Sequence, residues 1–198
     1  MAGDYSVKIV LGSSSPFRKS LLSKLLIDFE TCSPEIDETA LLNESPLELV
    51  KRLSIEKAKQ VAKSKPDSLI IGSDQVAVFD GKILGKPGDH NTAIKQLTSF
   101  SSQTVQFVTG LCLYNSTTSK VQYHQDTTWV HFRELSAHQI DNYLKKDQPY
   151  QCAGSFRSEG LGAALFTSIE SLDPNALIGL PIINLIGMLA VEGIDVLD

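Results

Sequence analysis

Apolar residues follow two distinct periods along the chain, and each period predicts one kind of element. Short apolar runs predict strands at 7–11, 28–34, 69–71, 76–79, 105–115, 121–132 and 165–171. Helical spacing predicts helices that begin at or near Pro16, Pro46, Asn91 and Ser136, and a last one in the second half of 176–191. Because strands and helices do not strictly alternate, we expect an α/β fold with a mixed, twisted sheet and flanking helices.

Residues at the element ends support this assignment. Ser15 is a predicted N-cap and Pro16 a predicted first helical residue, and the apolar spacing behind them continues through 21–26. Asp80-Gly81 predicts a two-residue hairpin turn. Pro181 is expected near the first turn of the last helix.

Composition places the chain in an ordinary globular class. It has 198 residues, of which 42% are hydrophobic and 21% are charged. We expect one domain over 1–198 with two lobes around a cleft, and the sequence shows no repeat or linker. The net charge of −5 argues against a broad nucleic-acid-binding surface, so an anion site would have to be a local basic pocket.

The cysteines and the hydrophobic runs bear on location. Cys32, Cys112 and Cys152 form neither a CxxC pair nor a zinc-finger spacing, which suggests idle thiols in a reducing compartment. The longest nearly continuous apolar run, 176–191, is shorter than the roughly 20 residues of a membrane span. The apolar run at 7–11 is too short for a signal peptide. We therefore expect a soluble, cytoplasmic protein with no membrane partner.

A first candidate site is the serine turn ahead of the first predicted helix. A strand-turn-helix junction presents unpaired backbone N–H groups, and the hydroxyls of Ser13 to Ser15 add donors. Arg18 and Lys19 lie in the first helical turn, where cations oppose the helix dipole unless an anion binds nearby. Two interpretations stay open: a polyphosphate site that uses Arg18, or a capped helix with solvated cations.

Further candidates lie near apolar strands and constrained loops. Asp74 follows an apolar run through Gly72-Ser73, which predicts a strand end facing a cleft. It is either a metal ligand or general base, or a turn residue bonded to its own backbone. Lys57 and Lys86 are also candidates, although most lysines are solvated. The acidic segment 35–38 lacks calcium-loop spacing but can supply oxygens to a magnesium ion that phosphates already hold.

Taken together, these stretches resemble a known family. SSSPFRKSLL, PEIDE, EKAK, IIGSDQV, LGKP, AGSFRSEGLG and GLPI occur in this order over most of the chain. That order resembles the Maf family of nucleotide pyrophosphatases. The resemblance implies a Maf/ITPase-like mixed α/β fold and hydrolysis of a nucleoside triphosphate to its monophosphate and pyrophosphate. It also implies a divalent metal cation, Mg²⁺ or Mn²⁺, and a small-molecule nucleotide substrate.

The resemblance also implies a role for each matching residue. Asp74 would be the general base that activates water, and Glu38 with Asp74 would help to hold the metal. The phosphates would be bound by Ser13, Arg18, Lys57 and Lys86. These roles suit phosphoryl transfer, in which catalysis is mostly positioning and charge stabilisation. Outside every motif lie the histidines, interpreted as structural or surface residues: His90, His124, His131 and His138.

Three positions resemble the branch of the family that acts on 7-methyl-GTP. Where the branch for ordinary pyrimidine triphosphates has arginine, threonine and glutamine, this chain has Phe17, Gln75 and Glu159. The 7-methyl-GTP branch usually has tryptophan at the first position, so phenylalanine is a mild departure. An aromatic face attracts the cationic ring of N7-methylguanine, and a carboxylate accepts from both its N1–H and its 2-amino group. The alternative is that Phe17 packs in the core and Glu159 is merely exposed.

Other functions fit parts of the sequence. One alternative is a pyrophosphatase for another altered or pyrimidine nucleotide, and another is a non-catalytic nucleotide-binding regulator of cell division. The full set of polar site residues argues against lost activity. A P-loop or Rossmann protein is rejected, because GxxxxGK[ST] is absent and EGLGAAL lacks the third glycine and the acidic residue of a dinucleotide fingerprint. A homodimer is left open.

Overall fold

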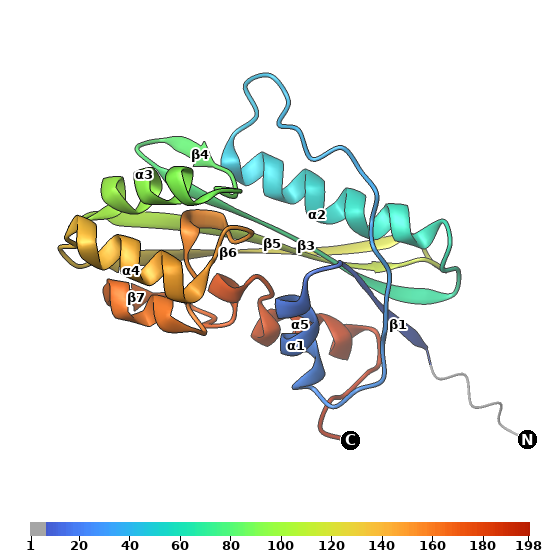
Figure 1. Cartoon of the computed structure of the whole chain (residues 1–198). Coiled ribbons are helices and arrows are strands. Elements are labelled where there is room, and N and C mark those ends of the chain that lie inside the picture. Colours follow the sequence, from blue (N-terminus) through green and yellow to red (C-terminus); the bar gives the residue numbers. More distant parts are fainter. Residues whose placement is uncertain (1–6) are drawn as a thin grey trace, which may run out of the picture. The chain divides into compact units, whose positions relative to one another are not determined.

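The computed structural model describes residues 7–198, which fold into two compact units (Figure 1). Within these residues, the first unit contains 7–74, 109–125 and 179–198, and the second contains 75–108 and 126–178. The two units match the two predicted lobes. The cleft between the lobes and the single domain over 1–198 stay predictions, and residues 1–6 of that range lie outside the described residues.

The described residues form a seven-stranded sheet of mixed direction, which confirms the predicted α/β class. Its strands are β1 (Lys8–Gly12), β2 (Glu30–Thr31), β3 (Ser68–Phe79), β4 (Lys82–Leu84), β5 (Thr104–Asn115), β6 (Lys120–Phe132) and β7 (Phe166–Glu170). The strand order is β2-β1-β3-β5-β6-β7, and β4 pairs with β3. β1 runs parallel to β2 and β3, whereas β4 and β7 run antiparallel to their neighbours.

In the first unit, helices cover both faces of the strands. These helices are α1 (Pro16–Ser23), α2 (Pro46–Ala62) and α5 (Ile182–Val191). On β6, the Gln122 amide donates to the Met188 carbonyl oxygen of α5 at 3.2 Å. The ring centroid of the adjacent Tyr123 lies 5.6 Å from Lys51 Nζ of α2. Because adjacent strand residues point to opposite faces, α2 and α5 lie on opposite sides of the strands, as Figure 1 shows.

Glycine lets α2 approach the strands closely. A Cβ atom added to Gly72 of β3 would lie 2.2 Å from the Ser54 carbonyl oxygen of α2, and Gly110 of β5 is similarly close to this helix. Any larger residue would push the helix away from the sheet. The close approach brings the next turn of α2, which carries Lys57, to hydrogen-bonding distance of Asp74.

Gly72→Ala is therefore expected to lower the free energy of unfolding by about 1–3 kcal/mol, the usual cost of overpacking. It should also impair any activity that depends on the Lys57–Asp74 contact. Denaturant unfolding followed by circular dichroism measures the first effect. The matched control is Gly187→Ala, because a Cβ added there meets nothing within 4 Å and alanine favours the helix α5. Unchanged stability and activity in Gly72→Ala would contradict this close packing.

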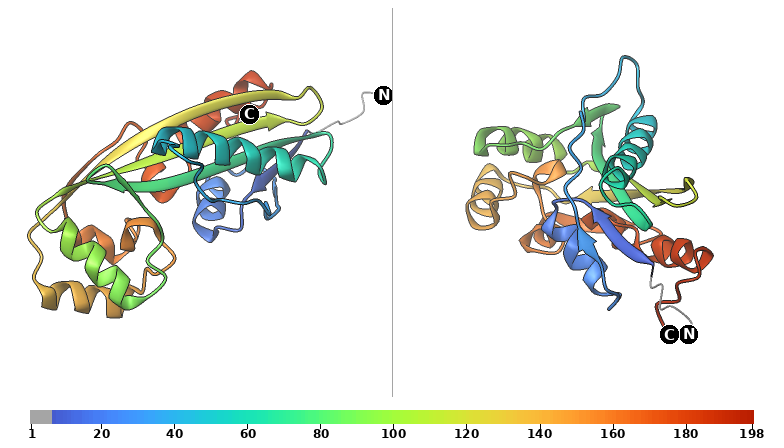
Figure 2. Two further views of the ribbon diagram at one scale, coloured as in Figure 1. Left: turned by 90° about the horizontal axis from the view of Figure 1, so that it is seen from above. Right: turned by 90° about the vertical axis from the view of Figure 1, so that its right-hand side faces the viewer.

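The second unit is built around an aromatic cluster. Its helices are α3 (His90–Phe100) and α4 (Ala137–Asp147), which lie side by side (Figure 2), and three short 3-10 helices, η1 (Ala153–Ser155), η2 (Leu161–Leu165) and η3 (Ala176–Ile178). Ring centroids 4.7–5.7 Å apart link Phe79, Phe100, Phe107, Phe132, Phe156 and Phe166. Such contacts stabilise a core beyond simple area burial. Phe156 thus anchors the chain just ahead of Glu159.

Most predicted element ends are confirmed. Ser15 caps α1, with Pro16 in its first turn, and Ser136 caps α4. Asp80-Gly81 takes positive φ at both residues and joins β3 to β4, as a two-residue hairpin turn requires. Pro181 stands at the N-cap of α5.

Two predicted elements are shorter in the structure. α1 ends at Ser23, because the N–H groups of Leu25 and Leu26 bond back to the preceding turn and Leu26 adopts φ 57°. Leu26 is 93% exposed, so it is no part of an apolar helical face. The strand predicted at 28–34 is only Glu30–Thr31, since these are the residues that pair with β1.

Asp74 does not lie at a strand end, so that prediction is wrong. The runs 69–71 and 76–79 are parts of the single strand β3, and Asp74 lies inside it. Gly72 pairs with Gly12 of β1, and Ser73 is fully buried, so Gly72-Ser73 continues the ladder instead of turning.

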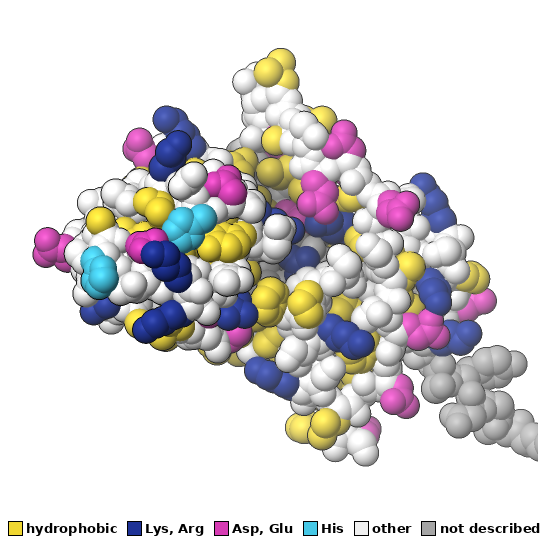
Figure 3. Space-filling model, in the orientation of Figure 1, with side chains coloured by type: hydrophobic (Ala, Val, Ile, Leu, Met, Phe, Trp, Pro, Cys, Tyr) yellow, Lys and Arg dark blue, Asp and Glu magenta, His cyan; other side chains and the backbone are white. Residues whose placement is uncertain are grey.

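The loop between β2 and α2 contains neither helix nor strand over 32–45. Leu41 and Leu42 near its tip are 60% and 92% exposed, and hydrophobic side chains are visible there in Figure 3. Hydrogen bonds, such as those from Arg52 to the Thr39 carbonyl oxygen and to Glu44, therefore hold the loop, and burial of its tip does not.

The thiols and the helices also bear on the predicted location. Cys32, Cys112 and Cys152 are free, and burial raises the pKa of Cys112 to about 12 and that of Cys152 to about 11. A thiol with a raised pKa is a poor nucleophile at neutral pH, which supports the interpretation of these two as idle. No helix within 7–198 is both long and apolar enough to cross a membrane.

Candidate active site

The serine turn between β1 and α1 is held by its own hydroxyl groups. Ser13 is buried, and its Oγ accepts the Ser15 N–H at 3.1 Å. The Ser15 Oγ in turn accepts the Arg18 N–H at 3.4 Å, which is the predicted N-cap bond. The turn therefore fixes the start of α1 and the helical turn that carries Arg18.

The Arg18 side chain is held by a distant carbonyl. Its Nε donates to the Gly179 carbonyl oxygen at 2.8 Å, and the Ser73 hydroxyl donates to the same oxygen at 2.8 Å. Gly179 has φ +119°, and a Cβ there would lie 3.3 Å from Arg18 Nε, so the position favours glycine on both counts. Burial lowers the pKa of Arg18, while the charges of Asp74 and Glu38 act to raise it. The guanidinium stays charged at any working pH.

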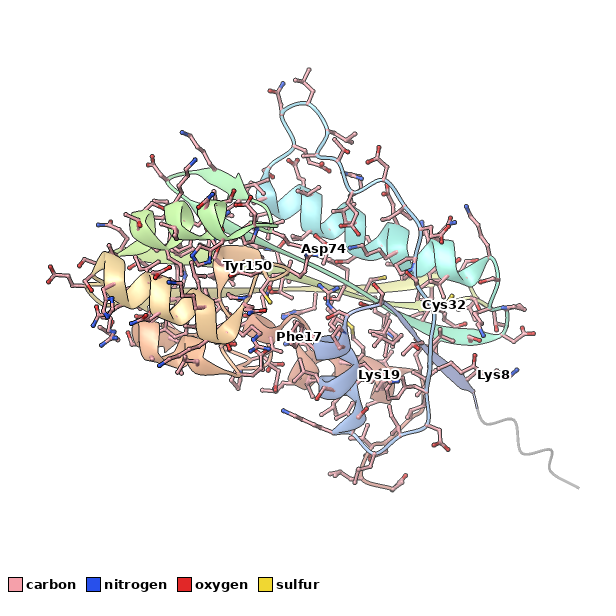
Figure 4. The ribbon with its side chains drawn as sticks, in the orientation of Figure 1. Lys8, Phe17, Lys19, Cys32, Asp74 and Tyr150 are labelled. Atoms are coloured by element: carbon pink, nitrogen blue, oxygen red, sulfur yellow. The ribbon has the colours of Figure 1, made fainter. Side chains whose placement is uncertain are left out.

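Arg18→Ala is expected to weaken binding of a nucleoside triphosphate about 10- to 100-fold, the range for a hydrogen bond to a charged group. Binding of the free nucleoside should change much less, because the role that the family resemblance implies for Arg18 is a contact with phosphate and not with the base. Isothermal titration with both ligands measures the difference. The matched control is Lys19→Ala, which removes the next cation of α1, an exposed one (Figure 4). Equal losses for the two ligands would place Arg18 away from the phosphates.

Lys57 joins the two carboxylates that the family resemblance assigns to the metal. Its Nζ lies 2.6 Å from Asp74 Oδ1 and 2.8 Å from Glu38 Oε1. Lys57 and Asp74 are 5% and 6% exposed, whereas the Glu38 side chain is 58% exposed. A buried ammonium is tolerated only with such partners. The predicted base, metal ligands and one phosphate ligand therefore meet in the first unit.

Hydrogen bonds from Arg52 hold the loop that carries Glu38. The Arg52 guanidinium donates to Glu44 Oε1 at 2.6 Å, to Glu44 Oε2 at 2.8 Å and to the Thr39 carbonyl oxygen at 3.0 Å. Hydrogen bonds from Arg52 lower the pKa of Glu44 to about 2, so the carboxylate stays charged at neutral pH. The residue next to Glu38 is thus tied to α2, the helix that also carries Lys57.

The carboxylates of Glu38 and Asp74 suit a divalent cation, but they supply only part of its coordination shell. Both carboxylates contact the Lys57 ammonium. Among residues 7–198, no three or more His, Cys, Asp or Glu side chains group as a metal site. Further oxygens would have to come from phosphates or water, which is the usual situation of Mg²⁺ at a nucleotide site.

In the second unit, Glu159 lines a cavity of about 280 Å³. The other lining residues are Ser158, Ile169, Ser171, Pro174, Leu177 and Ile178. Glu159 is the only charged residue among them. Apolar walls with a few convergent polar groups are typical of a small-ligand site.

Gln75 supports the wall of this cavity. Its side-chain amide donates to the carbonyl oxygens of Ala176 at 2.9 Å and Leu177 at 3.0 Å. Leu177 is one of the lining residues, so this bond ties the cavity wall to β3, in which Gln75 directly follows Asp74. Of the three predicted specificity residues, Glu159 lines this cavity, and Gln75 bonds to the backbone of one of its lining residues.

Neither Lys86 nor Phe17 is among the residues that line this cavity. Lys86 is exposed on the loop after β4, where the nearby Gly88 N–H donates to the Tyr150 carbonyl oxygen at 2.9 Å. His90 Nδ1 lies 2.9 Å from Tyr150 Oη, which fits the structural role predicted for this histidine. Phe17 is half-buried on α1 of the first unit (Figure 4). The roles assigned to Lys86 and Phe17 stay predictions.

Two residues near Arg18, Ser73 and Gly179, were not predicted from the sequence. The Gly179 carbonyl oxygen accepts from Arg18, and Ser73 donates to that same oxygen. The glycine of GLPI was a usable signal, because a glycine between apolar residues often marks a position with positive φ. Ser73 carried no comparable signal.

Comparison with known proteins agrees with the motif order. The model of the Maf-like protein family matches residues 8–192. This chain belongs to the Maf family. A protein from Colwellia psychrerythraea named 7-methyl-GTP pyrophosphatase is 54% identical, with 96% of this chain and 94% of that protein covered.

Other relatives show similar identity to this chain. Proteins of the same name from Vibrio vulnificus and Nitrosococcus oceani are 53% and 52% identical, each over 96% of this chain and over 97% and 95% of their own lengths. Among solved structures, the Staphylococcus aureus Ham1 protein aligns with a TM-score of 0.47 and 14% identity, over 77% of this chain and 88% of that chain. A likeness of that degree says nothing about function.

Proposed function

We propose that this Maf protein hydrolyses 7-methyl-GTP to 7-methyl-GMP and pyrophosphate. The observation that carries the proposal is the carboxylate of Glu159 on the wall of a cavity whose other lining residues are uncharged. The names of relatives that share 52–54% identity over 96% of this chain support the same substrate here.

The chemistry of the base explains why a carboxylate suits this cavity. Glu159 can accept both N1–H and the 2-amino group of guanine, whereas a glutamine would offer one acceptor and turn N–H donors toward them. The apolar side chains of Ile169 and Leu177 provide contact for the ring. The positive charge of the N7-methylated ring favours the carboxylate further, and Phe17 is the aromatic partner we assign to that ring.

Most of the residues that we assign to the triphosphate belong to the first unit. Asp74 is proposed to take a proton from the attacking water, with Lys57 beside it to neutralise phosphate charge. Ser13 and Arg18 bind phosphate at the start of α1, and Lys86 is assigned as a further phosphate ligand. Ser13, Arg18, Lys57 and Asp74 are each held by neighbours before substrate arrives, which is how positioning contributes to rate.

A divalent cation, Mg²⁺ or Mn²⁺, is the proposed cofactor. Glu38 and Asp74 would hold it together with phosphate oxygens. When bound, such a cation neutralises negative charge that develops on the transferred phosphoryl group. Lys57 would then share its carboxylate partners with the cation.

We also place the protein in the cytoplasm. Its three cysteines are free thiols, which is the usual state in a reducing compartment. A pool of nucleoside triphosphates is available there as substrate. Fractionation of cells that express the tagged protein tests this placement.

A substrate panel tests the proposed activity. The panel contains 7-methyl-GTP, GTP, UTP, dTTP and 5-methyl-UTP, each with Mg²⁺ and with Mn²⁺, and pyrophosphate is measured after coupled cleavage to phosphate. We expect the highest kcat/KM with 7-methyl-GTP. A preference for UTP or dTTP would favour a pyrimidine pyrophosphatase, and binding without turnover of any substrate would favour a non-catalytic regulator.

A further inference from the structure

Glu159 lies on a tight turn whose position decides where its carboxylate points. Residues 158–160 form this turn, and the Gly160 N–H donates to the Arg157 carbonyl oxygen at 3.3 Å. Glu159 itself is exposed, and its contact with the Ser158 hydroxyl is long, at 3.5 Å. The carboxylate therefore relies on the anchoring of the turn through Arg157.

Arg157 is anchored to the end of α4 by two residues. Its Nε donates to Asp147 Oδ2 at 3.2 Å, and its Nη2 donates to Asp147 Oδ1. The Tyr143 hydroxyl donates to Asp147 Oδ2 at 2.8 Å and accepts the Arg157 backbone N–H at 3.1 Å. Both the backbone and the side chain of Arg157 are thus fixed, and the two-point contact with Asp147 also fixes its orientation.

The charges of this cluster are stable in the neutral pH range. Burial alone would raise the pKa of Asp147, but hydrogen bonds from Arg157 and Tyr143 outweigh burial and lower it. The hydrogen bond to Asp147 raises the pKa of Arg157. Burial, with the hydrogen bond to Asp147, raises the pKa of Tyr143. Asp147 stays anionic, Arg157 cationic and Tyr143 neutral, so the anchor holds across the pH range in which the enzyme would work.

We propose that Tyr143, Asp147 and Arg157 are positioning residues for base selection. They fix the turn that presents Glu159 to the cavity. Acting only through Glu159, they increase the preference of the enzyme for a base with a 2-amino group over a base without one. The inference rests on the proposed function, since it assumes that Glu159 accepts from guanine. The Asp147 side chain is only 5% exposed, and this burial makes the anchor rigid enough for the role.

Asp147→Asn tests the inference. The substrates are 7-methyl-GTP and 7-methylinosine triphosphate, which has the same charged ring but lacks the 2-amino group. We expect the ratio of their kcat/KM values to fall about 10-fold or more, mainly through KM for 7-methyl-GTP, because a displaced Glu159 loses its geometry. In a Glu159→Gln background, Asp147→Asn should leave the ratio unchanged.

A second variant guards against loss of folding. Tyr143→Phe removes one hydroxyl, keeps the ring and the ion pair, and should lower the same ratio several-fold. Lys145→Ala, which breaks the exposed pair between Lys145 Nζ and Asp141 Oδ2 on the same helix, is the matched control and should leave it unchanged. An unchanged ratio in both Asp147→Asn and Tyr143→Phe, or an equal loss for both substrates, would overturn the inference.

The test separates failure of the inference from failure of the proposed function. Dissociation constants of the two nucleotides, measured by titration calorimetry, give the same ratio without turnover. If wild type binds 7-methyl-GTP more tightly but hydrolyses neither nucleotide, the proposed activity fails and the binding ratio in Asp147→Asn still decides the inference. If wild type does not distinguish the two nucleotides at all, the inference is wrong.

Discussion

Asp74→Asn is expected to lower kcat by about 10²- to 10⁴-fold, the range for loss of a general base. Asparagine keeps the shape of the side chain, and its amide oxygen can still accept from Lys57, which lies 2.6 Å from Asp74 Oδ1. It cannot take a proton from water. The nucleotide should therefore still bind, and the loss should appear in kcat measured by pyrophosphate release.

The control for this variant must address stability as well as chemistry. Asp74 is part of a buried ion pair, and removing one partner of such a pair can destabilise a protein by about 3–5 kcal/mol. Lys57 keeps Glu38 as a partner at 2.8 Å, which should limit the loss. Unfolding is measured on the same sample, with the exposed Asp28→Asn as a matched carboxylate-to-amide change. Turnover within a few-fold of wild type would rule out Asp74 as the base.

The triple change Phe17→Arg, Gln75→Thr and Glu159→Gln is expected to reverse base preference. Activity on 7-methyl-GTP should fall, and activity on UTP or dTTP should rise. Arginine repels a cationic ring, and a glutamine amide leaves one guanine donor unmet, which costs about 5- to 150-fold in discrimination. The measurement is kcat/KM for each substrate with wild type and the triple variant.

Single variants separate the parts of this effect. Glu159→Gln alone should already lower activity on 7-methyl-GTP. Gln75→Thr should act indirectly, because threonine is too short to keep both bonds to the carbonyls of Ala176 and Leu177 that shape the cavity wall. An unchanged ratio between 7-methyl-GTP and UTP in the triple variant would refute the specificity assignment, although pyrophosphatase activity could still be present.

Local signals were sufficient for most helices and strands. Ser15 and Ser136 each offered a hydroxyl at a helix start, and Asp80-Gly81 offered the backbone freedom of a tight turn. Asp74 was misplaced at a strand end because Gly72-Ser73 reads locally as a turn. Pairing with Gly12 and close packing against α2 keep that stretch extended, and neither contact is visible in a local pattern.

The family motifs were sufficient to predict which residues belong to the candidate site. Contacts that depend on the three-dimensional fold were less predictable. The motifs assigned Glu38, Lys57 and Asp74 to one site, and the structure brings these three side chains together. The anchoring of Glu159 was not predictable. It depends on Asp147, which lies ten positions before Arg157 on another element and belongs to no recognised motif.

The most direct test of the proposed activity is a competition in one tube. Equal concentrations of 7-methyl-GTP, GTP and UTP are incubated with the enzyme and Mg²⁺, and all nucleotides are followed by chromatography, so that the relative rates of loss give the ratio of kcat/KM values. We predict that 7-methyl-GTP disappears first and yields 7-methyl-GMP and pyrophosphate in equal amounts. Earlier loss of UTP or GTP, or release of orthophosphate with a nucleoside diphosphate, would contradict it.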